Sequence, residues 1–167
     1  YYVTIKNMSN NNVFLDEKCD FVDDAAIERI NQRSDLKIGD LLFSGIGTIG
    51  RVYLIDIPTN NWNISESVFT MRANDRVSKE FLYLLLLSKD MQSYCDNNAH
   101  GAAQKGIRMA DLRAYKFMLP CKYHLDEFTS KIKPIIDAAQ VCRKKVKILT
   151  EARDRLLPKL MSGELEV

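Results

Sequence analysis

The sequence is poor in histidine and has no paired cysteines. Its 167 residues include two histidines and four cysteines. Cys19, Cys95, Cys121 and Cys142 are widely and irregularly spaced, and no two of them form the C-x-x-C pair that is typical of zinc sites. We therefore expect no metal site, and we expect free thiols in a reducing cytoplasm.

Long apolar runs are missing as well. The longest apolar cluster, residues 81–87, is far shorter than the ~18 residues that a membrane span requires. The chain opens with Tyr1 and has neither an initiator methionine nor the basic and apolar stretches of a signal peptide. We expect a cytoplasmic protein with no membrane partner, and a piece of a longer protein.

Proline pairs are also lacking. Pro58, Pro120, Pro134 and Pro158 are isolated, and none of them precedes an aspartate. An amino-methyltransferase needs a Pro-Pro pair beside an aromatic residue to grip a flipped base, and the commonest nuclease carboxylate motif begins with Pro-Asp. The histidines and cysteines form no clear catalytic triad. We therefore expect a protein without catalytic residues of its own and without a cofactor.

A glycine motif is present, at residues 45–50 (GIGTIG), and it follows the apolar residues 41–43. It matches the G-x-G-x-x-G of dinucleotide sites, which require a helix after the last glycine. Residues 51–58 are instead β-branched and aromatic and end at Pro58. The motif therefore predicts a tight turn between two strands that holds no phosphate. Residues 43–47 (FSGIG) also resemble the F-x-G-x-G of S-adenosylmethionine methyltransferases, which leaves a free-standing DNA methyltransferase as an alternative.

Residues 1–120 predict a mixed-sheet α+β domain. Apolar alternation and β-branched residues indicate strands at residues 2–6, 40–44, 51–55, 67–72 and 116–119. Helical spacing indicates a helix over residues 23–31, with Asp23 or Asp24 as its N-cap. A second, deeply buried helix is expected from Ser78, its N-cap, to about Tyr94.

Two polar loops carry the residue types that read bases. Residues 101–108 (GAAQKGIR) hold a glutamine, which can bond adenine bidentately, and basic residues, which can bond guanine. Glycines there allow the backbone to approach phosphates closely. The alternative is an ordinary solvated loop, and the same holds for residues 60–63 (NNWN). We predict DNA contacts first from Gln104, Lys105 and Arg108, and more weakly from Arg51, Asn61 and His100.

From Leu125 onward the apolar spacing changes to alternating steps of three and four residues. This spacing predicts one long coiled-coil helix over residues 125–160, roughly 55 Å in length. Arg153 is the one polar position in the seam, and Pro134 and Pro158 lie within the pattern. The predicted seam consists of Leu125, Phe128, Ile132, Ile135, Ala139, Cys142, Val146, Leu149, Leu156 and Leu160.

Charge is unevenly placed along the chain. Residues 1–120 hold 14 Lys and Arg against 15 Asp and Glu, whereas residues 121–162 hold 10 against five. The basic run at residues 143–147 is interpreted as a solvated face of the helix rather than as a DNA site. The excess is too mild to indicate a nucleic-acid partner by itself.

Together, these pieces resemble the specificity subunits of type I restriction–modification enzymes. The opening residues 2–8, the Gly-Asp-strand-Gly block at residues 36–50 and the block at residues 101–120 look like the parts of a target-recognition domain in that family. The C-terminal residues 156–167 (LLPKLMSGELEV) carry the most specific likeness. The chain departs from the family pattern in having one domain and one helix, so we expect either a fragment of a longer subunit or a half-length subunit that must dimerise.

The resemblance implies a non-catalytic, DNA-binding subunit that reads one half of a bipartite double-stranded target. It assigns residues 1–120 to target recognition and residues 121–167 to a spacer and dimerisation helix with a C-terminal tail. The implied partners are methyltransferase subunits, a restriction–translocase subunit, and a second copy or second half-subunit joined through an antiparallel coiled coil. A dimerising protein–protein adaptor remains as a further alternative.

Overall fold

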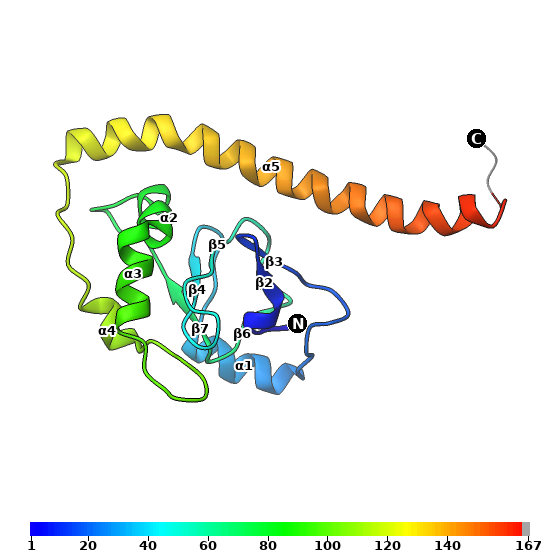
Figure 1. Ribbon diagram of the computed structural model, residues 1–167, viewed down its shortest axis with the longest axis horizontal. Helices are drawn as coiled ribbons and strands as arrows, with labels where there is room; N and C mark the ends of the chain where they lie inside the picture. The colour runs from blue at the N-terminus through cyan, green and yellow to red at the C-terminus, as the bar shows by residue number, and fades with distance from the viewer. Residues whose placement is uncertain (165–167) are drawn as a thin grey trace. The chain divides into compact units, whose positions relative to one another are not determined.

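The computed structural model describes residues 1–164. The chain divides into two compact units, Tyr1–Thr129 and a second unit that begins at Ser130. The predicted α+β class is confirmed: the first unit combines small sheets with short helices, and the long helix α5 (Lys122–Met161) follows in the chain (Figure 1). The predicted domain boundary after residue 120 stays a prediction. Residues 165–167 of the expected C-terminal tail lie outside the described part.

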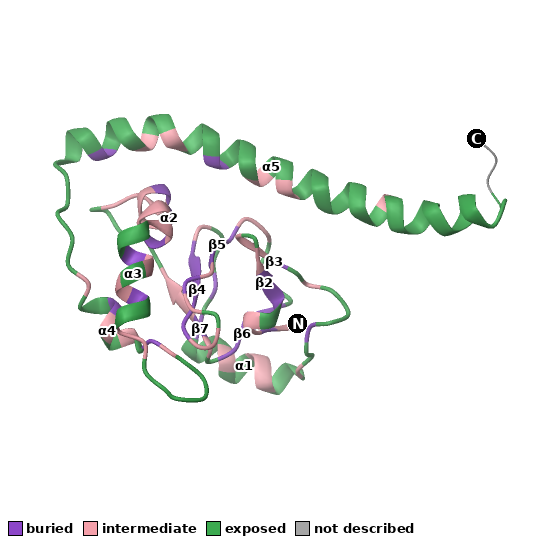
Figure 2. Cartoon of the chain, in the orientation of Figure 1, coloured by how far each residue is buried: buried purple, intermediate pink, exposed green. Residues whose placement is uncertain are grey.

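A three-stranded antiparallel sheet forms the centre of the first unit. Strand β4 (Leu41–Ser44) lies between β5 (Val52–Leu54) and β7 (Val68–Met71). Three of the predicted strands are thereby confirmed, and every residue of β4 and β5 is buried (Figure 2). The predicted turn at Gly45–Gly50 is confirmed too, because the segment joins β4 to β5 and no helix begins there. That this turn holds no phosphate stays a prediction.

Two smaller strand pairs accompany this sheet. Strand β1 (Tyr2–Val3) pairs in parallel with β6 (Asn63–Ile64), and β2 (Met8–Ser9) forms a hairpin with β3 (Asn12–Val13). The strand predicted over residues 2–6 was too long. After Val3 the chain turns into the 3-10 helix η1 (Ile5–Asn7), because the Asn7 side chain accepts a hydrogen bond from the Thr4 amide at 2.9 Å.

Both predicted helix starts form with their expected N-caps. Asp23 caps α1 (Asp24–Arg33) by accepting a hydrogen bond from the Ala26 amide at 2.7 Å, and Ser78 caps α2 (Lys79–Leu87). The single helix predicted over residues 78–94 was wrong. Ser88 ends α2 because its backbone is extended rather than helical. Its hydroxyl accepts a hydrogen bond from the Met91 amide and so caps a separate helix, α3 (Lys89–Asn97).

The strand predicted at residues 116–119 was also wrong. Helix α4 (Met109–Arg113) is followed by an irregular segment in which Met118 is 94% exposed. Side chains rather than a sheet hold this segment: Tyr115 contacts Tyr94 edge-on at 4.9 Å between ring centroids, and Phe117 lies beside Phe81. The apolar run at residues 117–119 was misleading, because Phe117 packs against an aromatic ring and the segment pairs with no strand among residues 1–164.

An ion pair joins the start of β4 to the end of β7. The Asp40 carboxylate is 2% exposed and accepts hydrogen bonds from Arg72 Nε at 2.6 Å, from Arg72 Nη2 at 2.7 Å and from the Lys37 amide at 2.8 Å. The hydrogen bond to Asp40 raises the pKa of Arg72 above its ordinary value. Because Arg72 follows β7 and Asp40 precedes β4, this pair joins the ends of two neighbouring strands.

Helix α5 is continuous over 40 residues and contains both Pro134 and Pro158. Within the first unit, Leu125 is buried and Phe128 contacts Phe81 edge-on at 5.9 Å between ring centroids. No helix among residues 1–164 combines the length and apolarity that crossing a bilayer would require.

We predict that Asp40→Ala lowers the free energy of unfolding by about 2–4 kcal/mol, because it leaves Arg72 and the Lys37 amide without their buried acceptor. Urea unfolding measures this loss. Asp35→Ala is the matched control, since the Asp35 side chain is 71% exposed and should contribute less than about 1 kcal/mol. Equal effects of the two variants would contradict the assigned role of Asp40.

We predict that Cys95 reacts far more slowly with iodoacetamide than Cys121 at pH 8. Burial raises the pKa of the Cys95 thiol to about 11, so about one molecule in a thousand carries the thiolate at that pH. Cys121 is exposed. Mass spectrometry of the labelled peptides measures both rates, and labelling in denaturant is the control, in which the two rates should converge. Similar rates in the folded protein would contradict the burial of Cys95.

Candidate nucleic-acid interface

The two glycine-containing segments singled out in the sequence lie against each other. The polar loop, residues 100–107, is closed by a pair of 2.8 Å hydrogen bonds between the backbones of His100 and Gly106. It docks on the turn after β4, where Gly47 donates to the Lys105 carbonyl at 2.7 Å and Ile107 donates to the Gly45 carbonyl at 2.8 Å. The backbone of the loop is therefore held in place.

Glycine is required at two positions of this arrangement. Gly101 has φ +112°, and a Cβ there would lie 2.3 Å from the Gln104 carbonyl oxygen. Gly47 has φ +78°, and a Cβ there would approach Ile5 Cδ1 to 2.6 Å and Gln104 Nε2 to 3.3 Å. The carboxamide of Gln104 thus lies over the turn at Gly47, which places a predicted base-reading group beside the predicted glycine turn.

Side chains from two other elements anchor the turn. The Ser44 hydroxyl donates to the Thr48 carbonyl at 2.6 Å and accepts from the Arg51 amide at 2.8 Å. The Gln92 carboxamide, on α3, donates to the carbonyls of Gly50 at 3.1 Å and Leu86 at 2.7 Å. These bonds connect the turn to both the sheet and the helices, so the surface formed with the polar loop has a fixed base.

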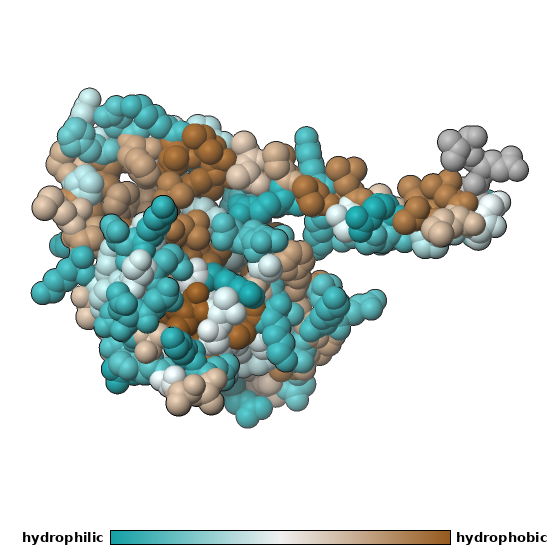
Figure 3. Space-filling view, in the orientation of Figure 1, coloured by the Kyte–Doolittle hydropathy of each residue, from teal (hydrophilic) through white to brown (hydrophobic). Residues whose placement is uncertain are grey.

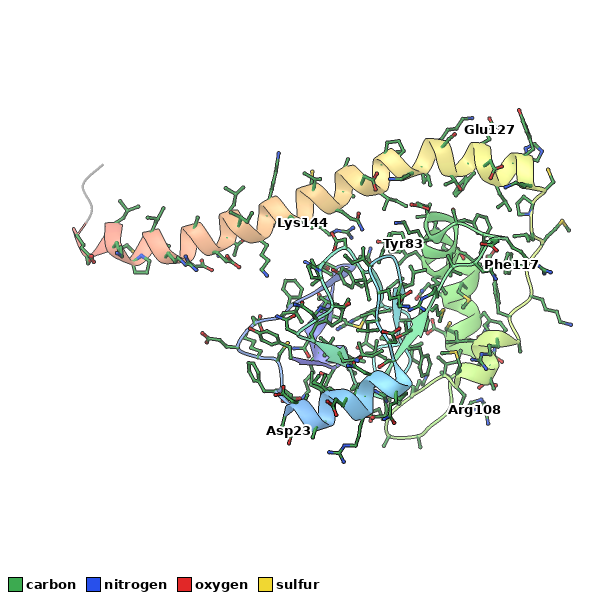
Figure 4. The ribbon with its side chains drawn as sticks, turned by 180° about the vertical axis from the view of Figure 1, so that it is seen from behind. Asp23, Tyr83, Arg108, Phe117, Glu127 and Lys144 are labelled. Carbon is green, nitrogen blue, oxygen red and sulfur yellow. The ribbon has the colours of Figure 1, made fainter. Side chains whose placement is uncertain are left out.

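Arg108 lies at the start of α4, next to the polar loop (Figure 4). It donates from Nε and Nη2 to the two oxygens of Asp111, at 2.9 and 3.2 Å, and the His100 imidazole lies 3.6 Å from the same carboxylate. The hydrogen bond that Arg108 donates to the carboxylate lowers the pKa of Asp111 and raises the pKa of Arg108. The Arg108 side chain remains 71% exposed.

The structure thus brings four of the six predicted DNA contacts together, namely His100, Gln104, Lys105 and Arg108, all of them exposed. Arg51 is occupied elsewhere, because its Nη1 donates to the carbonyls of Ile5 and Met8. Asn61 is exposed, and its carbonyl accepts from the Tyr1 amino group at 2.8 Å. All six stay predictions as DNA contacts.

The sequence did not reveal that the two residues after Asn61 are buried. Trp62 and Asn63 were taken as loop residues, but both are buried. The Asn63 carboxamide donates to Asn31 Oδ1 at 2.7 Å and to the Ser34 carbonyl at 2.8 Å. Sequence reasoning also missed Asp111, and its position three residues after Arg108 was the available signal.

The second unit presents a different kind of surface. Several predicted seam residues of α5 are exposed, Ile135 at 62%, Val146 at 63% and Leu149 at 67% among them. Brown patches along the C-terminal part of α5 in Figure 3 show apolar side chains gathered there. A stripe of this kind is typical of a helix that pairs with another helix.

Comparison with known proteins places the chain in a family. A family model described as type I restriction modification DNA specificity domain matches residues 1–139. The type I restriction enzyme HindI specificity subunit of Haemophilus influenzae is 27% identical over an alignment of 167 positions, which covers 98% of this chain and 35% of that protein.

A solved structure has the same fold. The S subunit of a type I restriction-modification system from M. genitalium superimposes with a TM-score of 0.55 at 22% sequence identity, over 74% of this chain and 33% of that one. The chain therefore spans about a third of the length of both relatives. With most of its residues matched by the family model, the chain belongs to the type I restriction modification DNA specificity domain family.

Proposed function

We propose that this chain is a non-catalytic target-recognition part of a type I specificity subunit, which reads one half of a bipartite double-stranded DNA site in the cytoplasm. The observation that carries the proposal is the polar loop docked on the turn after β4, with Gln104, Lys105 and Arg108 exposed beside one another. The family to which the chain belongs supports it.

The chemistry of these side chains suits base reading. A glutamine carboxamide can bond the N6 and N7 edge of adenine, and an arginine fork can bond O6 and N7 of guanine. Both groups stand on a backbone fixed by main-chain hydrogen bonds, so little freedom is lost when DNA binds. This surface is pre-organised for a specific contact.

Charge suggests that other subunits contribute to affinity. Residues 1–120 hold 14 basic and 15 acidic residues, so the domain lacks the large positive field that dominates non-specific DNA binding. We propose that methyltransferase subunits, together with a restriction–translocase subunit, supply further phosphate contacts and all of the chemistry. The specificity domain then contributes selectivity more than affinity.

We further propose that the exposed stripe of α5 pairs in an antiparallel coiled coil with a second copy of this helix or with the equivalent helix of a second half. Burying a large apolar side chain stabilises an assembly by about 1.5–3 kcal/mol, and the stripe offers several of them. The resulting helix pair would set the distance between two recognition domains.

The same stripe favours a second candidate function, a protein–protein adaptor that dimerises through α5. Methylome sequencing of a host with and without the intact gene distinguishes the two. A specificity subunit produces a methylated bipartite motif that disappears with the gene, whereas an adaptor leaves the methylome unchanged. S-adenosylmethionine titration addresses the methyltransferase alternative, since a recognition subunit alone should not bind that cofactor.

We predict that Gln104→Ala and Arg108→Ala each reduce discrimination between target and non-target DNA by about 1–3 kcal/mol in the assembled complex. Competition binding and methylation rates measure this change. Gln32→Ala and Arg29→Ala are matched controls on α1 and should leave discrimination unchanged. Unchanged target preference in both loop variants would refute the assignment of the polar loop.

We predict that Leu149→Asp abolishes pairing through α5 while the first unit stays folded, because it places a charge in the apolar seam. Analytical ultracentrifugation at tens of micromolar and circular dichroism measure the two properties. Thr150→Asp makes the same charge change one residue off the seam and should still pair. A clean wild-type monomer at that concentration would show that the seam has no partner of this kind.

A further inference from the structure

The pairing of Arg108 with Asp111 has a defined geometry. A guanidinium carries five N–H donors in a planar fork. Arg108 uses Nε, at 2.9 Å, and Nη2, at 3.2 Å, for the two carboxylate oxygens. The carboxylate therefore binds the edge of the guanidinium that Nε and Nη2 form. Nη1 and the remaining N–H of Nη2 form the other edge of the group. The two bonds to Asp111 do not use that edge, while Nη2 also lies 3.5 Å from His100 Nε2, at the limit of hydrogen-bond distance.

That second edge matches one base in particular. Guanine presents two neighbouring acceptors, O6 and N7, in the major groove, and no other base presents two acceptors there. Two parallel donors at the end of a guanidinium fit them. A freely rotating arginine can equally well bond a phosphate, so selectivity depends on what holds the fork in one orientation.

Asp111 is itself well held. Its carbonyl accepts a hydrogen bond from the Tyr94 hydroxyl at 2.8 Å, which connects α4 to α3. The neighbouring Leu112 is buried, and the Asp111 side chain is 21% exposed against 71% for Arg108. The carboxylate is therefore the fixed member of the pair, and the arginine is the member that can reach a ligand.

We propose that Asp111 is a positioning residue that makes Arg108 selective for guanine, an inference that rests on the proposed reading of DNA by this loop. A carboxylate near DNA also repels phosphates. Asp111 thus lowers affinity for any duplex while it raises selectivity for one base. A residue that served only the stability of the fold would not act on these two quantities in opposite directions.

The test uses the assembled complex and a library of duplexes randomised in the half-site, sequenced before and after binding. Affinity for an unrelated duplex is measured in parallel by fluorescence anisotropy at fixed salt. We expect Arg108→Ala to lose a guanine preference at one position. Asp111→Asn should lose the same preference by at least about fivefold, with equal or higher affinity for the unrelated duplex.

Two further variants strengthen the test. Asp111→Glu keeps the carboxylate and should retain part of the preference. Arg108→Lys keeps the charge but has no fork, so it should lose the preference even though Asp111 is intact. Asp96→Asn, on α3, is the matched control, because it removes the same charge and should leave the preference unchanged.

The inference is overturned if Asp111→Asn or Arg108→Lys keeps the full guanine preference, or if Asp111→Asn weakens binding to all duplexes in parallel. A wild-type complex that selects no base at the half-site would instead overturn the proposed function itself. A preference that is present but unaffected by Arg108→Ala would show that another residue reads this position.

Discussion

The docking of the polar loop on the turn after β4 is the contact on which the proposed recognition surface depends. Two main-chain hydrogen bonds make it, from Gly47 to the Lys105 carbonyl and from Ile107 to the Gly45 carbonyl. Main-chain bonds of this kind tolerate variation in the intervening side chains. A loop held in this way can keep its shape while its outward residues change.

Glycine links this contact to the rest of the sheet. Gly47 leaves room for Gln104 above the turn, and Gln92 holds Gly50 from the side of the helices. At the other end of β4, the pair of Asp40 and Arg72 joins this strand to β7. The polar loop is therefore bonded to the turn, and the turn is bonded to β4 and α3. The buried strands β4 and β5 stabilise the domain, and the exposed polar side chains lie on the loop beside them.

The sequence was most informative where one physical preference dominated. The N-caps at Asp23 and Ser78 could be predicted because short polar side chains satisfy the free amides at a helix start. The strand after Gly50 could be predicted because β-branched residues follow it. Prediction failed at Ser88 and at residues 116–119, where tertiary packing decided between two locally acceptable conformations. The cluster of His100, Gln104, Lys105 and Arg108 was predicted by residue type. The docking of their loop on the turn after β4 and the bond from Tyr94 to Asp111 join segments that are distant in the sequence. The pattern of residues along the chain does not reveal such contacts.

The most direct test of the account is a photo-crosslink from the polar loop to DNA. A benzoylphenylalanine placed at position 104, in the complex assembled with methyltransferase subunits, should crosslink on irradiation to a base within one half of the methylated motif. The same group at position 32 on α1 serves as the reference. Crosslinking of position 104 to the half-site, and not of position 32, is the predicted result. A half-site that crosslinks to position 32 but never to position 104 would contradict the account.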